Sequence, residues 1–93
     1  MSVTAIHLVI HGRVQGVGYR AWTSGTAKRL GLNGWVRNRR DGTVEALLIG
    51  EEDAIATMRT ECLNGPMAAK VEKIDERAWN GERPSGFEQL PTL

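Results

Sequence analysis

The chain has 93 residues, of which 41% are hydrophobic and 25% charged, a composition typical of a folded protein and unlike that of a disordered chain. This length predicts one domain over residues 1–93, and the single cysteine, Cys62, excludes an internal disulfide and a cysteine-based zinc site. No apolar run approaches the roughly 18 residues of a membrane helix and no secretory signal is visible, so we expect a cytoplasmic protein with no membrane partner.

The net charge of +1 conceals an asymmetry along the chain. Residues 1–40 carry seven basic and no acidic side chains, whereas the remaining residues carry five basic and eleven acidic ones, which gives +7 and −6. Folding could interleave the two parts and cancel the charges. Alternatively, the first forty residues could build a site for an anion.

The first predicted elements are a strand, a glycine-rich stretch and a helix. Residues 6–11 alternate in polarity, with Ile6, Leu8 and Ile10 on one face, and this period of two predicts a strand with one buried face. The stretch GRVQGVGYR, residues 12–20, follows directly. From Tyr19 the pattern predicts a helix that Gly31 ends. The residues expected on its buried face are Tyr19, Trp22, Thr26 and Leu30.

A hairpin and a second helix are predicted next. Residues 33–38 and 43–49 read as its two strands, and Asp41 and Gly42 supply the turn. The second strand would direct Val44, Ala46 and Leu48 to the core. Acidic residues 51–53 suit the positive end of a helix dipole, and the helix stops at residues 64–66 (NGP). Its inner face would carry Ile55, Met58 and Cys62.

Two further strands complete the predicted fold. Residues 69–79 predict a long strand with a bulge or an uncertain start, because Val71 and Ile74 are out of step by one residue. After a loop over residues 80–86, residues 87–90 predict a short closing strand. The order β-α-β-β-α-β favours an α+β ferredoxin-like sandwich, with an antiparallel sheet and both helices on one face. This topology by itself indicates no function.

The glycine-rich stretch is the candidate anion site. Glycines between a strand and a helix let successive backbone N–H groups turn around one point, and the helix start adds its positive dipole. Arg20, on the first helical turn, could add a guanidinium fork that matches two phosphate oxygens. The alternative is a plain strand-to-helix connection, and the spacing leaves both interpretations open. The stretch is neither a Walker loop nor a dinucleotide fingerprint.

Two motifs resemble one known family. Residues 12–20 (GRVQGVGYR) are similar to the acylphosphatase signature, a glycine, then Val-Gln-Gly-Val, one variable residue, an aromatic and an arginine. A second family pattern matches at residues 34–38 (GWVRN), followed by residues 41–45 (DGTVE) and Gly50. The resemblance covers nearly the whole chain and implies a small ferredoxin-like domain. Only residues 87–93 (FEQLPTL) depart from the aliphatic-then-arginine ending common in the family.

The resemblance also implies an activity and its residues. An acylphosphatase hydrolyses the carboxyl-phosphate bond of an acyl phosphate to a carboxylate and inorganic phosphate. Arg20 would bind the phosphoryl group, and Asn38 would position the attacking water. The backbone N–H groups expected to share the phosphoryl group belong to Gln15, Gly16, Val17, Gly18 and Tyr19. Without the resemblance, Asn38 reads as a turn-forming residue ahead of the hairpin. We expect no cofactor and no metal, a small-molecule acyl phosphate as partner, and a monomer.

Other residues suggest rival functions. His7 and His11 share a strand face but lie roughly 13 Å apart, too far to share a metal. Residues 37–40 (RNRR) would suit a nucleic-acid module or would steer an anionic substrate, yet they also read as solvated edge and turn residues. The single Phe and single Tyr argue against the paired stacking aromatics of an RNA-binding sheet, so no nucleic-acid partner is expected.

Two alternative functions involve the same predicted anion site. The domain could hold an anion without turning it over, and the loop would then look the same. It could also act within a carbamoyl-phosphate-handling maturation protein, in which a similar domain is fused to others. A chain of 93 residues favours an independent enzyme.

Overall fold

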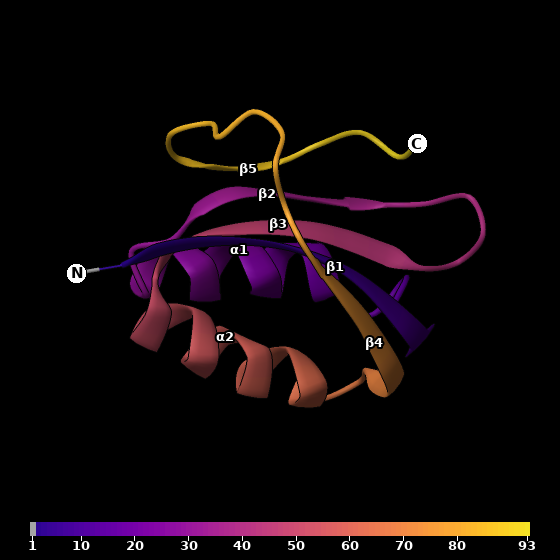
Figure 1. Cartoon of the computed structure of the whole chain (residues 1–93). Coiled ribbons are helices and arrows are strands. Elements are labelled where there is room, and N and C mark those ends of the chain that lie inside the picture. The colour runs from indigo at the N-terminus through magenta and orange to yellow at the C-terminus, as the bar shows by residue number, and fades with distance from the viewer. Residues whose placement is uncertain (1) are drawn as a thin grey trace.

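The computed structural model describes residues 2–93 and places β1 at the N-terminal end of the chain (Figure 1). The elements follow in the order β1 (Val3–Arg13), α1 (Tyr19–Arg29), β2 (Asn33–Asn38), β3 (Val44–Glu51), α2 (Glu52–Asn64), β4 (Lys70–Ala78) and β5 (Phe87–Gln89). The helices, the hairpin and both later strands lie where the sequence predicts them. β1 is longer than residues 6–11, because pairing with β3 begins at Val3.

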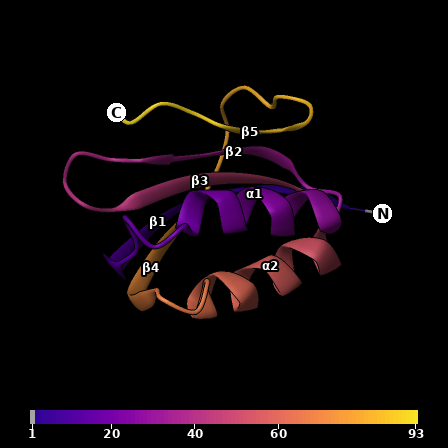
Figure 2. The same cartoon turned by 180° about the vertical axis from the view of Figure 1, so that it is seen from behind.

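The five strands form one sheet in the order β4-β1-β3-β2-β5. Both helices cover one face of this sheet, as the two opposite views in Figures 1 and 2 show. The fold is therefore the predicted α+β ferredoxin-like sandwich. One detail of the prediction is wrong: β5 pairs in parallel with β2, so the sheet is mixed rather than antiparallel. The chain from β4 has to cross the whole sheet before β5 begins, and it arrives running in the direction of β2.

The bulge predicted in the fourth strand is present. Ile10 pairs with Ile74 and His11 with Lys73, but Gly12 pairs with Val71, so Glu72 is the extra residue. Such a bulge turns the side chains that follow it by one position. The shift explains why Val71 and Ile74 both pack against the helix-covered core although their positions differ by three, an odd number.

The main core lies between the sheet and the helices. Ile10, Val36 and Leu48 are completely or almost completely buried there, and Ile55, Met58 and Cys62 meet them from α2 as predicted. The buried face of α1 differs from the prediction. Its buried residues are Tyr19, Thr23, Ser24, Thr26 and Ala27, whereas Trp22 and Leu30 are only partly buried. Small side chains face the sheet because they let the helix approach it closely.

The helix-free face of the sheet is also partly covered. Ala5, Leu47 and Ile49 are buried in a second cluster, with Trp35 and Trp79 packed against it. The connection between β4 and β5 runs over this face (Figure 1). As a result, residues 5–8 of β1 and residues 44–49 of β3 are buried on both faces, and the expectation of a single buried face for the first strand is wrong over that part.

Candidate active site

The glycine-rich loop connects β1 to α1 at the edge of a small pocket. Gly16 and Gly18 have φ angles of 73° and 80°, in the left-handed region that favours glycine. Gly18 is the residue that precedes the first turn of α1, and its carbonyl accepts the first helical hydrogen bond, from Trp22 N, at 3.0 Å. The two glycines therefore bend the chain so that a helix N-terminus follows the strand at once.

The backbone N–H groups of this loop have no backbone partner among residues 2–93. In the described part of the chain, the N–H groups of residues 15–21 donate to no backbone carbonyl. The first turn of α1 carries no acidic side chain that would neutralise its positive dipole. A run of unpaired N–H groups at a helix N-terminus favours negative charge.

The pocket at this loop holds the two side chains that the sequence singles out. It has a volume of about 150 Å³ and is lined by Val14, Gly16, Gly18, Tyr19, Arg20, Ala21, Asn38 and Gln89. At about 30 Å³ per water in the liquid, that volume has room for a small anion and a water. Arg20 is half-buried and takes part in none of the ion pairs among residues 2–93. It is also the only charged residue lining the pocket.

Asn38 reaches the pocket from the last position of β2. Its Oδ1 is buried and has no hydrogen-bond partner among the described residues. An unpaired buried acceptor is uncommon and costs free energy of about 1–3 kcal/mol, so such a group indicates a partner from outside the protein. The structure thus brings Arg20 and Asn38, 18 positions apart in the chain, to one pocket.

Gln15 connects the loop to the β2–β3 hairpin. Its Nε2 donates to the carbonyl of Arg39 at 2.7 Å and to that of Thr43 at 2.9 Å. The Nε2 group is therefore occupied inside the protein, and the backbone N–H is the donor that Gln15 can offer to an anion. Val17 packs against the core and, like Gln15, does not line the pocket.

Tyr19 fixes the other end of the loop. The ring is buried, and the hydroxyl donates to the carbonyl of Cys62 in α2 at 2.6 Å. Burial raises the pKa of Tyr19 far above its usual value, so the hydroxyl stays protonated. Burial also raises the pKa of the Cys62 thiol, to about 12, and this excludes a reactive thiolate near neutral pH. The Tyr19 hydroxyl therefore anchors the start of α1 to the end of α2.

Gln89 is a pocket residue that the sequence analysis missed. It lies in β5, two positions after Phe87, whose ring is buried in the helix-covered core. Because strand side chains alternate, Gln89 points to the same face as Phe87 and reaches the pocket. The apolar Phe87 in the predicted closing strand was a sequence signal that this strand has a core-facing side. Only the parallel pairing of β5 with β2 places Gln89 at the pocket.

The basic residues around Asn38 are not free. Glu45 in β3 accepts a hydrogen bond from Arg37 Nε at 2.7 Å and forms a second ion pair with Arg39 at 3.4 Å. Burial raises the pKa of Glu45, but hydrogen bonds from Arg37 and His7 outweigh it and hold the pKa of this carboxyl below its usual value. These contacts correct the expectation of a solvated edge residue for Arg37, whereas Arg39 lies beyond the end of β2 and keeps 38% of its side chain exposed. His11 pairs with Asp75 at 2.9 Å near the surface.

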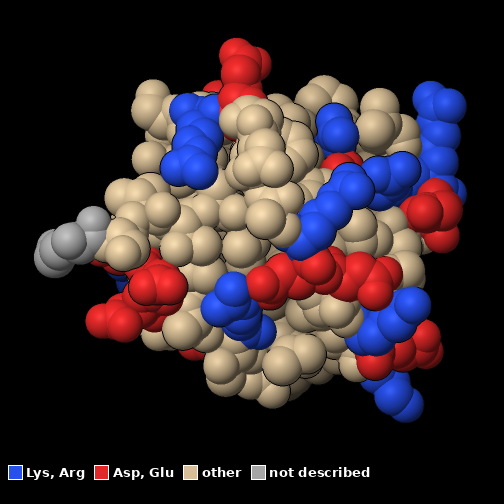
Figure 3. All heavy atoms as spheres, in the orientation of Figure 1, with Lys and Arg blue, Asp and Glu red and all other residues tan. Residues whose placement is uncertain are grey.

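Ion pairs also join the basic first part of the chain to the acidic remainder. Arg29 pairs with Glu61 across the two helices, and Arg37 pairs with Glu45. Figure 3 shows basic and acidic side chains interspersed on one face of the molecule, with no patch of a single sign. The two ion pairs show that folding brings basic residues of the first part beside acidic residues of the second.

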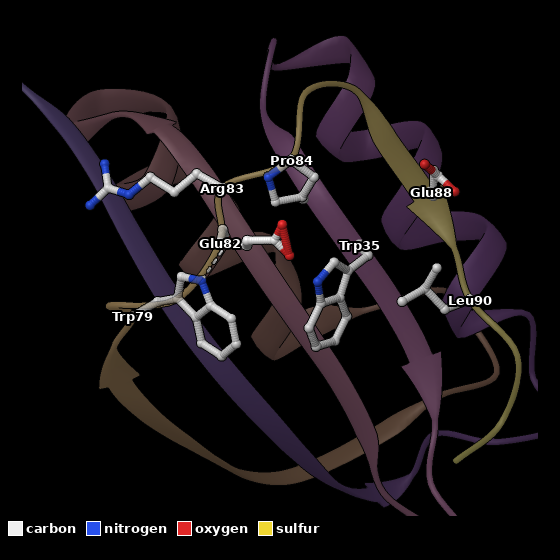
Figure 4. Close-up of a pocket in the computed structure, with 8 residues that line it drawn as sticks. Trp35, Trp79, Glu82, Arg83, Pro84, Glu88 and Leu90 are labelled. Atoms are coloured by element: carbon white, nitrogen blue, oxygen red, sulfur yellow. Dashed lines mark hydrogen bonds between the residues drawn. The ribbon is translucent and has the colours of Figure 1, made fainter.

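A second pocket lies on the helix-free face, away from these residues. Its volume is about 350 Å³, and Figure 4 shows Trp35 and Trp79 standing beside Glu82 and Pro84 in it. None of the predicted site residues lines it. The indole N–H of Trp79 donates to the carbonyl of Glu82 at 2.8 Å, which fastens the β4–β5 connection over the sheet. In residues 2–93, neither α1 nor α2 has the length and apolar character to cross a membrane.

Comparisons with known proteins point to one family. The family model for acylphosphatase matches residues 6–89. A curated acylphosphatase of Nitrobacter hamburgensis is 55% identical over 92 residues, with 92% of this chain and 93% of that protein covered. The solved structure of an acylphosphatase from Coxiella burnetii superposes with a TM-score of 0.90 at 34% identity, and covers 95% of this chain and 93% of its own.

A larger protein contains a similar fold. The structure of full-length HypF in a phosphate- and nucleotide-bound form superposes with a TM-score of 0.89 at 25% identity, but the match takes up only 12% of that chain. The Nitrobacter and Coxiella proteins, in contrast, match this chain over nearly their whole length. The matched motifs, the fold and these relatives agree, and the chain belongs to the acylphosphatase family.

Proposed function

We propose that the chain hydrolyses the carboxyl-phosphate anhydride of small acyl phosphates, with the phosphoryl group bound between the 15–19 loop and Arg20 and the water held by Asn38. The observation that carries this proposal is the shared pocket. It combines unpaired loop N–H groups, an unpaired arginine and the buried, unpartnered Oδ1 of Asn38. No other pocket residue is charged, so the site suits an anion.

The phosphoryl group would be bound by the N–H groups of Gln15 to Tyr19 and by the guanidinium of Arg20. Phosphoryl transfer passes through a loose transition state with charge spread over the equatorial oxygens. Preorganised N–H donors and one permanent positive charge stabilise that charge without rearranging. The two positive-φ glycines support this role, because they hold the loop bent before any ligand arrives.

Asn38 would orient the water. Its Oδ1 accepts a hydrogen bond from the water, and the amide cannot act as a base near neutral pH. The water oxygen forms a bond to phosphorus while the bond between phosphorus and the acyl oxygen breaks, and the acyl group leaves as a carboxylate. The proton lost by the water goes to a phosphate oxygen. A carboxylate is a good leaving group, so this chemistry needs no strong general acid.

We also propose that residues 1–93 act as one domain and that one chain suffices. Support comes from the pocket itself, because the loop, Arg20 and Asn38 of one chain come together there. The engagement of Arg37 and Arg39 with Glu45 weighs against the nucleic-acid alternative, because those guanidiniums are already paired.

Hydrolysis of benzoyl phosphate tests the proposal. We expect the wild-type chain to release phosphate and Arg20→Ala to lose about 10²- to 10³-fold in kcat/KM, since one electrostatic contact to the transition state has about that effect. Arg29→Ala is the matched control, because it removes an arginine at the opposite end of the same helix. If the wild-type chain binds phosphate but does not hydrolyse benzoyl phosphate, the binding-domain alternative is favoured. Equal activity of Arg20→Ala and Arg29→Ala would refute the assignment of Arg20 to the site.

A further inference from the structure

A buried ionic network lies on the helix-free face of the sheet, on the opposite side from the pocket of Arg20 and Asn38. The proposed chemistry does not use it. Its centre is Glu45, which is only 5% exposed. His7 Nε2 lies 2.5 Å from Glu45 Oε2, and Arg37 Nε donates to Oε1 at 2.7 Å. Because an ionised carboxylate can only accept, Nε2 is the protonated nitrogen of His7.

Aromatic rings cover this network. Trp79 stacks on His7 with centroids 5.6 Å apart, and Trp35 meets His7 edge-on at 6.2 Å. The guanidinium of Arg37 lies 4.7 Å from the Trp35 ring centre. Figure 4 shows the two tryptophans side by side under the β4–β5 connection, where the Glu82 carbonyl holds Trp79. Glu45 and His7 are thus fixed in place and largely kept from water, whereas Arg37 and Arg39 approach Glu45 from the more exposed side.

The network includes both residues that flank Asn38 in the chain. Arg37 pairs with Glu45 across β2 and β3, and Arg39 reaches the same carboxylate from just beyond β2. Strand side chains alternate, so Arg37 points to the helix-free face while Asn38 points to the helix-covered face and its pocket. One carboxylate therefore holds both neighbours of the residue assigned to the water.

The orientation of the Asn38 side chain is not fixed by a hydrogen bond to its own Oδ1 from any residue that the structure describes. The Oδ1 has no partner among the described residues, so protein contacts to that atom do not set its direction. Its place depends on the backbone of residues 37–39. Gln15 holds that backbone from the pocket side through the carbonyl of Arg39, and Glu45 holds it from the opposite face. A buried ion pair is a weak source of stability compared with apolar packing, which favours a geometric role for it.

We propose that Glu45 is a positioning residue that sets the direction of the Asn38 amide by holding Arg37 and Arg39. This inference rests on the proposed role of Asn38 in hydrolysis. It predicts that removing the charge of Glu45 slows the chemical step, whereas the affinity for phosphate is retained.

The test compares Glu45→Gln, Asn38→Ala and the double variant, using benzoyl phosphate as substrate and inorganic phosphate as inhibitor. We expect Glu45→Gln to lower kcat about tenfold, because a displacement well under 1 Å has effects of this order. The inhibition constant for phosphate should stay within about twofold, because that constant reports on the loop and Arg20. The double variant should match Asn38→Ala, since a residue that acts through Asn38 adds nothing in its absence.

Glu76→Gln is the matched control. It breaks an ion pair of 2.8 Å with Arg59, between β4 and α2, and should change neither kcat nor the phosphate constant. If Glu45→Gln does not fold, Arg39→Gln removes one arm of the network and is expected to lower kcat in the same selective way. A normal kcat in the folded variant, or full additivity with Asn38→Ala, overturns the inference. A normal kcat in Asn38→Ala would instead overturn the proposed water site.

Discussion

At the scale of single residues, the proposed phosphate site has one guanidinium. Among the described residues, Arg20 is the only charged one that lines the pocket, and its proposed role would rest on shape as well as charge. A planar fork matches two phosphate oxygens at once, whereas an ammonium is a point charge. The loop around it offers backbone N–H groups, which a change of side chain leaves in place unless the new residue is proline. Substitution at Arg20 therefore tests the guanidinium while the loop donors remain.

Arg20→Lys separates the charge from the fork. We expect it to recover less than about a tenth of the activity that Arg20→Ala loses, because the bidentate contact is gone although the charge remains. Steady-state kinetics with benzoyl phosphate measure this, and Arg29→Lys serves as the control at the other end of α1. Near-normal activity in Arg20→Lys would mean that charge alone suffices.

Tyr19 shows how a residue of the loop stabilises the molecule. In a continuing helix the Cys62 carbonyl would accept from the N–H of residue 66, but Pro66 has none, and the Tyr19 hydroxyl takes its place. Tyr19→Phe leaves that carbonyl unpaired in a buried position. We expect the free energy of unfolding to fall by about 1–3 kcal/mol, measured by urea denaturation. A change below about 0.5 kcal/mol would show that the hydrogen bond is not needed.

At the scale of elements, β2 can lie beside β3 only because of Gly34. A Cβ built at this position would lie 1.8 Å from the carbonyl oxygen of Leu47, and the φ of Gly34 is 135°. Gly34→Ala must therefore push β2 away from β3 or change the backbone. We expect a loss of more than about 2 kcal/mol in unfolding free energy, in the range of strained backbone positions.

The control for this variant is Gly25→Ala in α1. Nothing lies within 4 Å of a Cβ added there, and alanine is the better helix former. We expect Gly25→Ala to stabilise the protein by up to about 1 kcal/mol. Thermal unfolding of both variants checks the pair of predictions. Equal stability of Gly34→Ala and the wild type would contradict the close approach of the two strands.

The elements themselves were largely predictable from local patterns. Asp41 and Gly42 mark the hairpin turn, and the helices have clear stop residues. Local patterns failed where long-range contacts decide the outcome. The parallel pairing of β5 follows from a crossing over the sheet. The burial of His7 follows from a carboxylate 38 positions away, although a histidine in an alternating strand reads as exposed.

The site was predictable only in part for the same reason. Arg20 and the glycines belong to one continuous motif, so the resemblance identified them together. Asn38 came from a second motif, and only the fold brings the two to one pocket. Gln89 and the network around Glu45 carry no local signal. Each depends on strands that are neighbours in the sheet but distant in the sequence.

At the scale of the whole molecule, Glu45 links stability to pH. Its pKa lies below the usual 4.5 in the folded chain, so the unfolded chain takes up the proton first as the pH falls. The stabilisation from ionised Glu45 is present at a pH above the pKa of Glu45 in the unfolded chain. It is lost as the pH falls through the pKa of Glu45 in the folded chain. Asp41 and Glu76 also have lowered pKa values, through hydrogen bonds from Thr43 and Arg59.

Unfolding free energies measured between about pH 6 and pH 3 test this linkage. We expect wild-type stability to fall across this range and Glu45→Gln to fall less steeply, because the glutamine amide binds no proton there. At pH 6 the variant should be less stable, since Arg37 loses its buried counter-charge. Parallel curves for the two proteins would show that Glu45 titrates alike in the folded and unfolded chain.

The strand order has a consequence for how quickly the chain folds. Apart from the β2–β3 hairpin, every neighbouring pair of strands joins segments that are far apart in the sequence. The entropy of closing these long loops is lost before their contacts form, which slows the search for the native topology. We expect β5 to pair last, because its parallel partner β2 lies across the sheet from β4. We therefore expect refolding over milliseconds to seconds, slower than helical proteins of equal length.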